Sequence, residues 1–385
     1  TTCKCRDGVT CGSLPGQCSP RAATNGMAGE QLWRGERVAG DVTKAPFMNV
    51  AARSSLLSST ARDRPLRTRG YRKLWKTYQA GTMSKKADQK RQVPCYNIID
   101  GVPRGPYCEP ECLRNALNFK PRDGDVILVA YPKSGSHWVQ QVMLLILNKG
   151  ESATDYYDHI EKAAFMEMNG TKELLDKMPS PRMMRTNLPI LSRKSCHKNA
   201  KYVYMARNPW DCSVSFYHHV KGIAKFRFEN GSFDDFLDCF LEGNFGFGDY
   251  FDHILSGYEM RNEPNVFFST YEQFKEDTPG SIRKLAYFLG EEYGKMLDND
   301  ENIFKQVMEK SSPEFMKKIM EFESTDSSAD GKPQDVKVFN FVRKAKVGDW
   351  KHYFNQELLQ KMAAKIEEKT KGSDIMNLWK RPTES

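Results

Sequence analysis

A lysine, a glycine and two serines lie together in the segment YPKSGSHW, residues 131–138. The segment follows a short apolar run and precedes a helical pattern, which is where backbone N–H groups and a helix dipole converge on an anion. Gly135 permits a close backbone approach, Ser134 and Ser136 supply hydroxyl donors, and Lys133 supplies a positive charge. These residues predict a phosphate-binding loop, with an ordinary strand-to-helix turn as the alternative.

Two further segments contain cationic and hydroxyl side chains that could bind phosphate. Arg207 ends another apolar run, Ser215 follows two helical turns later, and RKAKVGDWK occupies residues 343–351. A guanidinium group can bond two phosphate oxygens at once. Taken alone, Arg207 is best interpreted as part of a surface ion pair and Ser215 as a helix residue without a special role. Residues 343–351 are best interpreted as a solvated basic loop.

Three strand–loop–helix units are expected to position these residues. Apolar runs predict strands buried in a parallel sheet, and Asn208 with Pro209 predicts the start of the second helix. The repeated pattern predicts an α/β fold. The expected strands are 126–130, 201–206 and 266–269, and the expected helices are 137–148, 209–220 and 279–289.

Two other segments are readable from their pattern. Phe233, Phe236 and Phe240 recur at helical spacing and predict a helix that faces the core. Residues 321–338 are polar and predict a loop.

The positive charge of the chain is unevenly placed. The 385 residues contain 58 Lys and Arg against 49 Asp and Glu, a formal charge of +9. Residues 1–82 hold 14 basic and five acidic residues, so the remaining residues hold 44 of each. The basic total is therefore no evidence that the folded part binds nucleic acid, and no apolar run reaches the roughly 20 residues of a membrane helix. We expect no nucleic acid and no membrane as partner.

The composition divides the chain into three parts. Residues 1–82 lack periodicity, which predicts a disordered basic leader or translated upstream sequence before Met83; a transit-type segment and a nucleic-acid arm are the alternatives. Residues 83–120 are turn-rich and predict an extended segment that leads into the fold. Residues 121–385 are expected to form the domain.

The segment YPKSGSHW resembles YPKSGTTW, the signature of the cytosolic sulfotransferases, which use 3′-phosphoadenosine 5′-phosphosulfate (PAPS) as sulfonate donor. The resemblance extends from about Pro103 to Lys380. It implies a cytoplasmic enzyme with a single α/β domain: a short parallel sheet flanked by helices on both faces, and a P-loop-like phosphate-binding loop. The nucleotide is then expected at the carboxyl ends of the strands.

Matched position by position, the first signature implies that Lys133 contacts the 5′-phosphosulfate and stabilises the leaving bridge oxygen. Trp138 is implied to stack on the adenine. The implied loop around the 5′-phosphate is Ser134, Gly135, Ser136 and His137.

The segment VYMARNPWDCSVSFYHH is similar to the second signature of the family, which binds the 3′-phosphate. Ala345 stands where the family has glycine, and a left-handed backbone there would make alanine costly. The residues implied to bind the nucleotide are Arg207, Ser215, Arg343 and Lys344 at the 3′-phosphate, and Tyr271 and Ser311 near the adenine.

The catalytic histidine of the family is replaced in this chain. The Lys-Thr-His-Leu-Pro segment corresponds to Arg185–Pro189, where Asn187 takes the place of the histidine. An amide orients an acceptor but is no general base, and general-base catalysis contributes ~10²–10⁴-fold. Transfer to an acidic phenol or an amine needs less help. His218 and His219 are expected on the outside or at the end of their helix, and Glu167 is a possible substitute base.

Three functions are compatible with these residues. The first is a sulfotransferase that moves the sulfonate of PAPS to a hydroxyl or amine of a small-molecule acceptor. The second is a catalytically impaired protein of the same fold that binds PAPS or its product PAP. The third, a nucleotide kinase, is disfavoured because the Walker pattern GxxxxGK[ST] is absent.

The remaining expectations concern metal, acceptor and assembly. No metal is implied, because lysine, arginine and helix termini meet the phosphates of the donor. The phenylalanine-rich segment 226–255 is expected to supply part of the acceptor pocket. The dimerisation motif of the family, KxxxTVxxxE, is not recognisable after Trp350, so the sequence predicts no dimer through it.

Overall fold

The computed structural model describes residues 3–4, 10–11, 91–190, 196–324 and 337–379. Five parallel strands form the central sheet in the order β6-β7-β5-β8-β9. The arrangement confirms the predicted α/β fold class and the three predicted strands. The bounds are β5 Val126–Ala130, β6 Ala164–Phe165, β7 Met183–Thr186, β8 Lys201–Ala206 and β9 Val266–Thr270.

Strand β5 is buried on both faces because its side chains alternate between two cores. Ile127 and Val129 enter one core, whereas Val126 and Leu128 enter the other. Strand β8 runs parallel to β5, with Val126 opposite Lys201. A continuous apolar run such as VILVA is what a strand covered on both faces requires.

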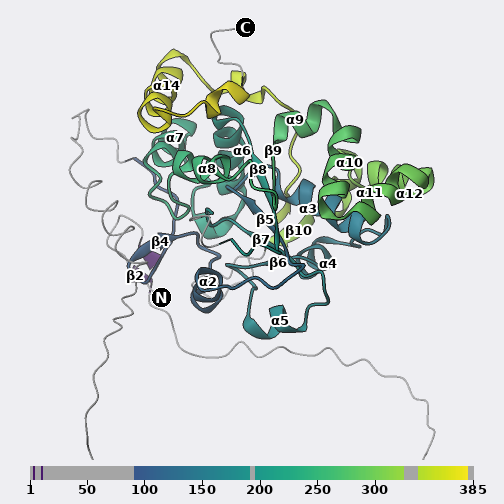
Figure 1. The fold of residues 1–385 in the computed structure, drawn as a ribbon. Coiled ribbons are helices and arrows are strands. Elements are labelled where there is room, and N and C mark those ends of the chain that lie inside the picture. The colour runs from purple at the N-terminus through teal and green to yellow at the C-terminus, as the bar shows by residue number, and fades with distance from the viewer. Residues whose placement is uncertain (1–2, 5–9, 12–90, 191–195, 325–336, 380–385) are drawn as a thin grey trace, which may run out of the picture. The chain divides into compact units, whose positions relative to one another are not determined.

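Helices cover both faces of the sheet (Figure 1). One face packs against α3 (Ser136–Leu147), α10 (Thr278–Leu289), α11 (Glu291–Asn299) and α12 (Glu301–Lys310). The other packs against α6 (Pro209–Gly222), α7 (Phe233–Glu242), α8 (Tyr250–Glu259) and α14 (Gln356–Thr370). The three phenylalanines of α7 with helical spacing are buried, as predicted. No described helix is both long enough and apolar enough to cross a membrane.

The chain that leads into the sheet is not extended throughout. Strands β3 (Asn97–Ile99) and β4 (Val102–Arg104) form an antiparallel hairpin, and β1 (Cys3–Lys4) and β2 (Thr10–Cys11) extend its sheet. Helix α2 (Pro110–Leu117) follows. Its proline lies in the first turn, where the missing N–H costs nothing, so this proline starts a helix. Residues 83–90 and most of residues 1–82 lie outside the described residues, so the leader stays a prediction.

The remaining elements are short. Strands β10 (Glu321–Ser324) and β11 (Lys337–Asn340) pair antiparallel, so the predicted loop 321–338 begins and ends in strands. Residues 325–336 between them lie outside the described part of the chain. The other short helices are α4 (Tyr156–Glu161), α5 (Lys172–Lys177), α9 (Tyr271–Glu276), α13 (Pro313–Ile319), η2 (Ala224–Phe226), η3 (Asp349–His352) and η4 (Ile375–Leu378).

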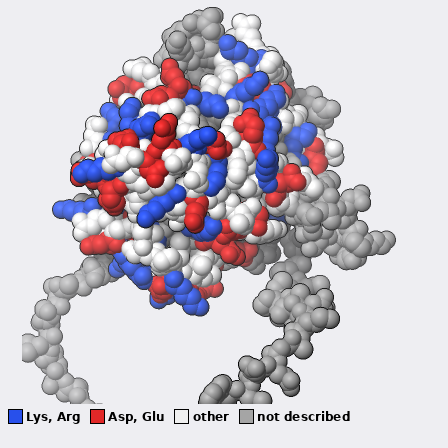
Figure 2. Space-filling view, turned by 90° about the vertical axis from the view of Figure 1, so that its right-hand side faces the viewer, with Lys and Arg blue, Asp and Glu red and all other residues white. Residues whose placement is uncertain are grey.

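The surface charge of the domain is mixed. On the face that Figure 2 shows, Lys and Arg side chains intermingle with Asp and Glu side chains. This agrees with the equal numbers of basic and acidic residues after position 82. The positive charge that matters for an anionic ligand must therefore be sought locally.

Candidate active site

The carboxyl ends of the sheet strands open onto one cavity of about 620 Å³. Lys133 follows β5, Asn187 follows β7, Arg207 follows β8 and Tyr271 begins directly after β9. Parallel strands place their carboxyl ends at one edge, so residues far apart in the sequence meet there. The other predicted residues that line this cavity are Gly135, Ser136, His137, Trp138, Ser215, Ser311, Arg343 and Lys344.

Ser134 is a predicted site residue that does not line the cavity. It is fully buried, and its Oγ lies 3.9 Å from the Sγ of Cys212. Its backbone N–H donates to the carbonyl of Tyr131 at 3.1 Å. Ser134 therefore supports the loop from the core side, and its hydroxyl does not face the cavity.

The first turn of α3 borders the cavity without a side-chain cap. Its N-cap is Gly135, with φ of +95°, and a Cβ there would lie 2.8 Å from Cδ2 of Tyr271. The first N–H groups of a helix have no intrahelical acceptors. By contrast, Asn208 caps α6 by accepting from the N–H of Asp211 at 2.7 Å, and Thr270 caps α9. The open start of α3 is therefore suited to an anion.

Lys133 forms no ion pair with any residue in the described part of the chain. Burial lowers the pKa of Lys133 to about 7, and the Arg207 guanidinium adds to this effect. The Nζ atom lies 5.5 Å from the centre of the Phe341 ring. Lys133 also has φ of +70°, a left-handed backbone that costs a non-glycine residue about 1–2 kcal/mol. An anion bound here would restore its charge.

Arg207 reaches from the end of β8 to the loop after β5. Its Nη1 donates to the carbonyl of Lys133 at 3.0 Å, and its guanidinium lies 4.4 Å from the centre of the Tyr271 ring. Tyr250 donates its hydroxyl to the carbonyl of Arg207. The Nε of Arg207 is buried and has no hydrogen-bond partner among the described residues. The guanidinium is thus held in place, while its Nε–H group remains available to a ligand.

A carboxylate at the start of α6 holds the loop 343–350. Asp211 accepts the backbone N–H of Gly348 at 2.7 Å and that of Trp350 at 3.0 Å. Asp211 is almost fully buried. It was missed by sequence reasoning, although it lies four residues after Arg207 in the second signature.

A second carboxylate positions the two cations of this loop. Asp349 accepts from Nη2 of Arg343 at 2.6 Å and from Nζ of Lys344 at 2.8 Å. Burial raises the pKa of Asp349, but the hydrogen bonds from Lys344 and Arg343 outweigh it and hold that pKa below its usual value. The Nε of Arg343 remains unpaired among the described residues.

Ala345 has φ of +52°, in the left-handed region that glycine adopts freely. We expect Ala345→Gly to raise the free energy of unfolding by up to about 1 kcal/mol, because it relieves this strain. The matching rise of about 2 °C in Tm is measurable by thermal unfolding. Gly348→Ala is the matched control, because Gly348 has φ of +85° with open space around its Cβ position. It should lower Tm, and a lower Tm for Ala345→Gly would contradict the strain argument.

Two aromatic rings, those of Trp138 and Tyr271, line another part of the cavity. The Trp138 ring centre lies 5.5 Å from that of Tyr271, and its Nε1 donates to the carbonyl of Ser311 at 2.9 Å. The hydroxyl of Ser311 donates to the carbonyl of Met308 at 3.3 Å. Rings fixed in this way offer faces and edges to a planar base.

Asn187 is fixed by its neighbours. Its Nδ2 donates to the carbonyl of Ala130 at 2.6 Å, and its backbone N–H donates to Oε1 of Glu167 at 2.7 Å. Its carbonyl lies 3.2 Å from Nε2 of His253. Glu167 is buried, and burial raises its pKa, but it does not line the cavity. It positions the Asn187 segment and does not reach a ligand as a substitute base.

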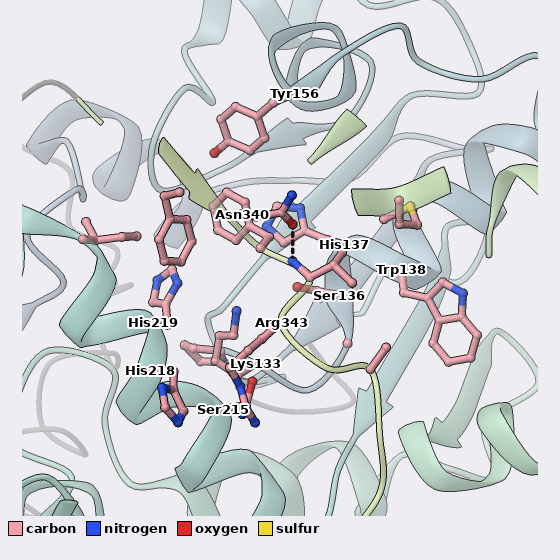
Figure 3. Close-up of a pocket in the computed structure, with 18 of the residues that line it drawn as sticks. Lys133, Ser136, His137, Trp138, Tyr156, Ser215, His218, His219, Asn340 and Arg343 are labelled. Atoms are coloured by element: carbon pink, nitrogen blue, oxygen red, sulfur yellow. Dashed lines mark hydrogen bonds between the residues drawn. The ribbon is translucent and has the colours of Figure 1, made fainter. Parts of the chain in front are cut away.

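His219 lies in the last turn of α6, near the end of the helix as expected, but neither histidine is on the outside of the helix. Both line the cavity, and His219 is also buried (Figure 3). Nε2 of His218 lies 2.7 Å from the hydroxyl of Tyr353. The ring of His219 lies 5.7 Å from those of Phe339 and Phe341. Strand β11 and the residue after it cover this side of α6, a long-range contact that helical periodicity does not reveal.

Aromatic side chains form one wall of the cavity. Tyr156 stacks on Phe322 at 4.8 Å and on Phe341 at 5.1 Å between ring centres. The expectation that segment 226–255 supplies this wall is wrong, because none of its residues lines the cavity. Rings such as Phe236 instead fill the core between α6, α7 and the sheet.

A buried arginine also lines this cavity. The guanidinium of Arg185 lies 4.4 Å from the centre of the Phe165 ring, and its Nη1 lies 2.9 Å from Nδ1 of His137. Arg185 was visible in the segment that carries Asn187, but sequence reasoning gave it no role. Its place in β7, at the carboxyl edge of the sheet, brings it to the cavity.

Comparison with known proteins agrees with this geometry. The family model described as "Sulfotransferase domain" matches residues 123–374. The amine sulfotransferase of Oryctolagus cuniculus is 33% identical over 68% of this chain and 86% of that protein. Sulfotransferase 1 family member D1 of Mus musculus is 34% identical over 67% of this chain and 87% of that protein.

Solved structures show the same architecture. Mouse sulfotransferase SULT7A1 complexed with PAP is 26% identical, with a TM-score of 0.57 over 73% of this chain and 96% of that chain. A retinol dehydratase in complex with retinol and PAP has a TM-score of 0.54 over 68% and 86% of the two chains; at 24% identity it supports the fold alone.

The chain belongs to the sulfotransferase family. It is an enzyme of PAPS-dependent sulfonate transfer to small-molecule acceptors, with PAPS as cosubstrate. In the described part of the chain, no group of three or more His, Cys, Asp or Glu side chains is placed to hold a metal ion.

Proposed function

We propose that the cavity at the strand ends holds PAPS through the residues that the sequence singled out. The observation that carries the proposal is the open start of α3 beside Lys133 and Arg207, two cations without ion pairs among the described residues. The proposed 5′-phosphosulfate contacts are Lys133 and the backbone and hydroxyl donors of Gly135, Ser136 and His137. The proposed 3′-phosphate contacts are Arg207, Ser215, Arg343 and Lys344, and the proposed adenine contacts are Trp138, Tyr271 and Ser311.

The buried, unpaired Nε atoms of Arg207 and Arg343 support this assignment. A buried donor without an acceptor is costly, so a ligand that accepts from it gains affinity. Charge-assisted bonds from guanidinium to phosphate are among the stronger hydrogen bonds of proteins. These residues fit a nucleotide that carries phosphate at both ends of its ribose.

The acceptor proposed for this enzyme is a planar phenol, alcohol or amine. The nearly parallel rings of Tyr156, Phe322 and Phe341 support a flat, apolar body. The acceptor heteroatom would attack the sulfur while Lys133 stabilises the charge that develops on the bridge oxygen. Asn187 is tied to a backbone carbonyl, so it contributes orientation and no proton transfer. We also propose a cytoplasmic location, which rests on the likeness to cytosolic sulfotransferases.

Radiolabelled sulfonate transfer tests the proposed function. The full chain and Asn187→His would be incubated with labelled PAPS and a panel of phenols, alcohols and amines. We expect labelled product from at least one acidic phenol or amine with the natural chain. We expect Asn187→His to broaden the acceptor range. Tight binding of PAP without transfer at any pH would support the binding-protein alternative, and phosphoryl transfer from ATP would overturn the assignment.

Proton uptake on binding tests the role of Lys133 separately. The free site lowers the pKa of Lys133 to about 7, and a bound phosphate would raise it again. At pH 8 the free amine is mostly neutral and the bound one charged, so binding of PAP should take up nearly one proton. Affinity should fall as the pH rises above about 7.

Calorimetry in buffers of different ionisation enthalpy measures this uptake at pH 8. Lys133→Met is the control, because it removes the titrating group and should abolish the uptake. Binding of PAP to the natural chain with no proton uptake at pH 8 would contradict the placement of phosphate at Lys133.

A further inference from the structure

The acceptor must lose a proton during transfer, and the residue at position 187 cannot take it. The amide of Asn187 is already engaged with the carbonyl of Ala130 at 2.6 Å. Glu167 lies outside the cavity lining. Apart from lysines, the described residues that line the cavity and could accept a proton from neutral form are the histidines at 137, 218 and 219.

Two of these histidines are engaged or badly placed. The ring of His137 faces a permanent cation, with Nη1 of Arg185 at 2.9 Å from Nδ1 and 3.1 Å from Nε2. A proton added to that ring would meet the guanidinium directly. His218 shares a hydrogen bond of 2.7 Å with Tyr353. The charged groups that act on it are Arg343, Asp349, Lys344 and Lys221, so it belongs to the proposed 3′-phosphate end.

His219 differs from both. It lies on α6, is only 6% exposed, and lines the cavity. No hydrogen bond to its ring occurs among the described residues, and its Nδ1 is buried without a partner. Aromatic rings surround it, at 5.8 Å from Phe226 and 5.7 Å from Phe341. Its ring therefore has a lone pair that no described residue occupies.

His219 lies in the part of the cavity that also contains Lys133, where the transfer reaction is proposed to occur. Both residues line the cavity, and Figure 3 shows their side chains in the same part of it. Burial, reinforced by the Lys133 ammonium, holds the pKa of His219 well below its usual value. The ring is thus neutral at pH 7 and can accept a proton, and the negative charge of a bound phosphosulfate would raise its pKa toward the working pH. The charged or titratable groups that bear on it are Lys133 and the neighbouring His137.

We propose that His219 is the proton acceptor of this enzyme, in place of the histidine that Asn187 replaces. The proposal rests on the proposed function, because it requires the reacting sulfur to lie at Lys133. The acceptor oxygen forms the new O–S bond as the bond from sulfur to the bridge oxygen breaks. The acceptor proton passes to Nε2 of His219, since the Nδ1 atom is buried. The bridge electrons remain on the phosphate of PAP, beside Lys133.

The test compares acceptors of different acidity. 4-Methylphenol keeps its proton at pH 7.5 and needs a base, whereas 4-nitrophenol is largely ionised and needs little help. His219→Gln should lower kcat for 4-methylphenol by about 100-fold or more, and for 4-nitrophenol by less than about 10-fold. His197→Gln is the matched control, because His197 is a half-exposed surface histidine paired with Asp123. It should leave both rates unchanged.

A second variant separates a base from a packing residue. Asn187→His, introduced into the His219→Gln variant, should raise kcat for 4-methylphenol at least tenfold above that of His219→Gln alone. The affinity of His219→Gln for PAP should equal that of the natural chain, which shows that the variant folds. Equal losses on both phenols, no loss on either, or no restoration would overturn the proposal.

The proposed function and this inference fail in different ways. If the natural chain binds PAP but transfers sulfonate to neither phenol, the role of His219 is overturned while the nucleotide site stands. If the natural chain does not bind PAP, the proposed function itself is overturned.

Discussion

Replacing Lys133 with alanine is expected to lower kcat/KM for sulfonate transfer by about 10²–10³-fold, with most of the loss in kcat. The reason is electrostatic. Negative charge develops on the bridge oxygen as the sulfur leaves, and a buried ammonium stabilises that charge far better than water does. Lys133 is held at this point by an unusual backbone, with φ of +70° and its carbonyl bonded to Arg207.

Steady-state transfer from labelled PAPS to 4-nitrophenol measures this loss. That acceptor removes proton transfer from the comparison, so the change reports on the leaving group. Lys295→Ala is the matched control, because Lys295 is exposed on α11 and pairs with Glu291. It should retain full activity. If Lys133→Ala kept more than a tenth of the natural kcat, the role assigned to this ammonium would be wrong.

Replacing Arg207 with alanine is expected to weaken PAP binding by about 100-fold or more. Hydrogen bonds to charged groups contribute about 1.5–3 kcal/mol each, and the substitution removes a guanidinium with a buried, unpaired Nε. It also removes the bond from Nη1 to the Lys133 carbonyl, so the phosphate loop loses a support.

Arg207→Lys distinguishes charge from geometry. It keeps the positive charge but has no planar fork, so its affinity for PAP should fall between those of the natural chain and Arg207→Ala. Affinity for adenosine 5′-monophosphate, which has no 3′-phosphate, should change much less in either variant. A uniform loss for both nucleotides would instead indicate collapse of the loop after β5.

The sheet could be predicted from the sequence because its central strands have apolar runs that are recognisable locally. The run VILVA is apolar at every position, and β5 is buried at every position. Asn208 and Pro209 mark the start of α6, and the structure has that cap with a hydrogen bond of 2.7 Å. By contrast, β6 has two residues and β7 carries Arg185 and Thr186, so neither has the apolar pattern of a buried strand.

The site was only partly predictable from the sequence. A motif indicates the residues that face the ligand, but it does not indicate the residues that position them. Asp211 and Asp349 lie within recognised segments, yet their partners are backbone N–H groups and cations seen only in three dimensions. The surroundings of His219 depend on Phe339 and Phe341, which lie more than 100 residues further along the chain. Ser134 follows the motif, but its hydroxyl faces Cys212 in the core.

We propose that this cavity binds a nucleotide with phosphates on both its 3′ and 5′ positions. The most direct test is a calorimetric titration of the full chain with PAP and, separately, with adenosine 5′-monophosphate. The cluster of Arg207, Arg343 and Lys344 predicts one binding site per chain. It also predicts an affinity for PAP at least about 100-fold higher than the affinity for adenosine 5′-monophosphate. Equal affinities for the two nucleotides, or no binding of PAP, would contradict it.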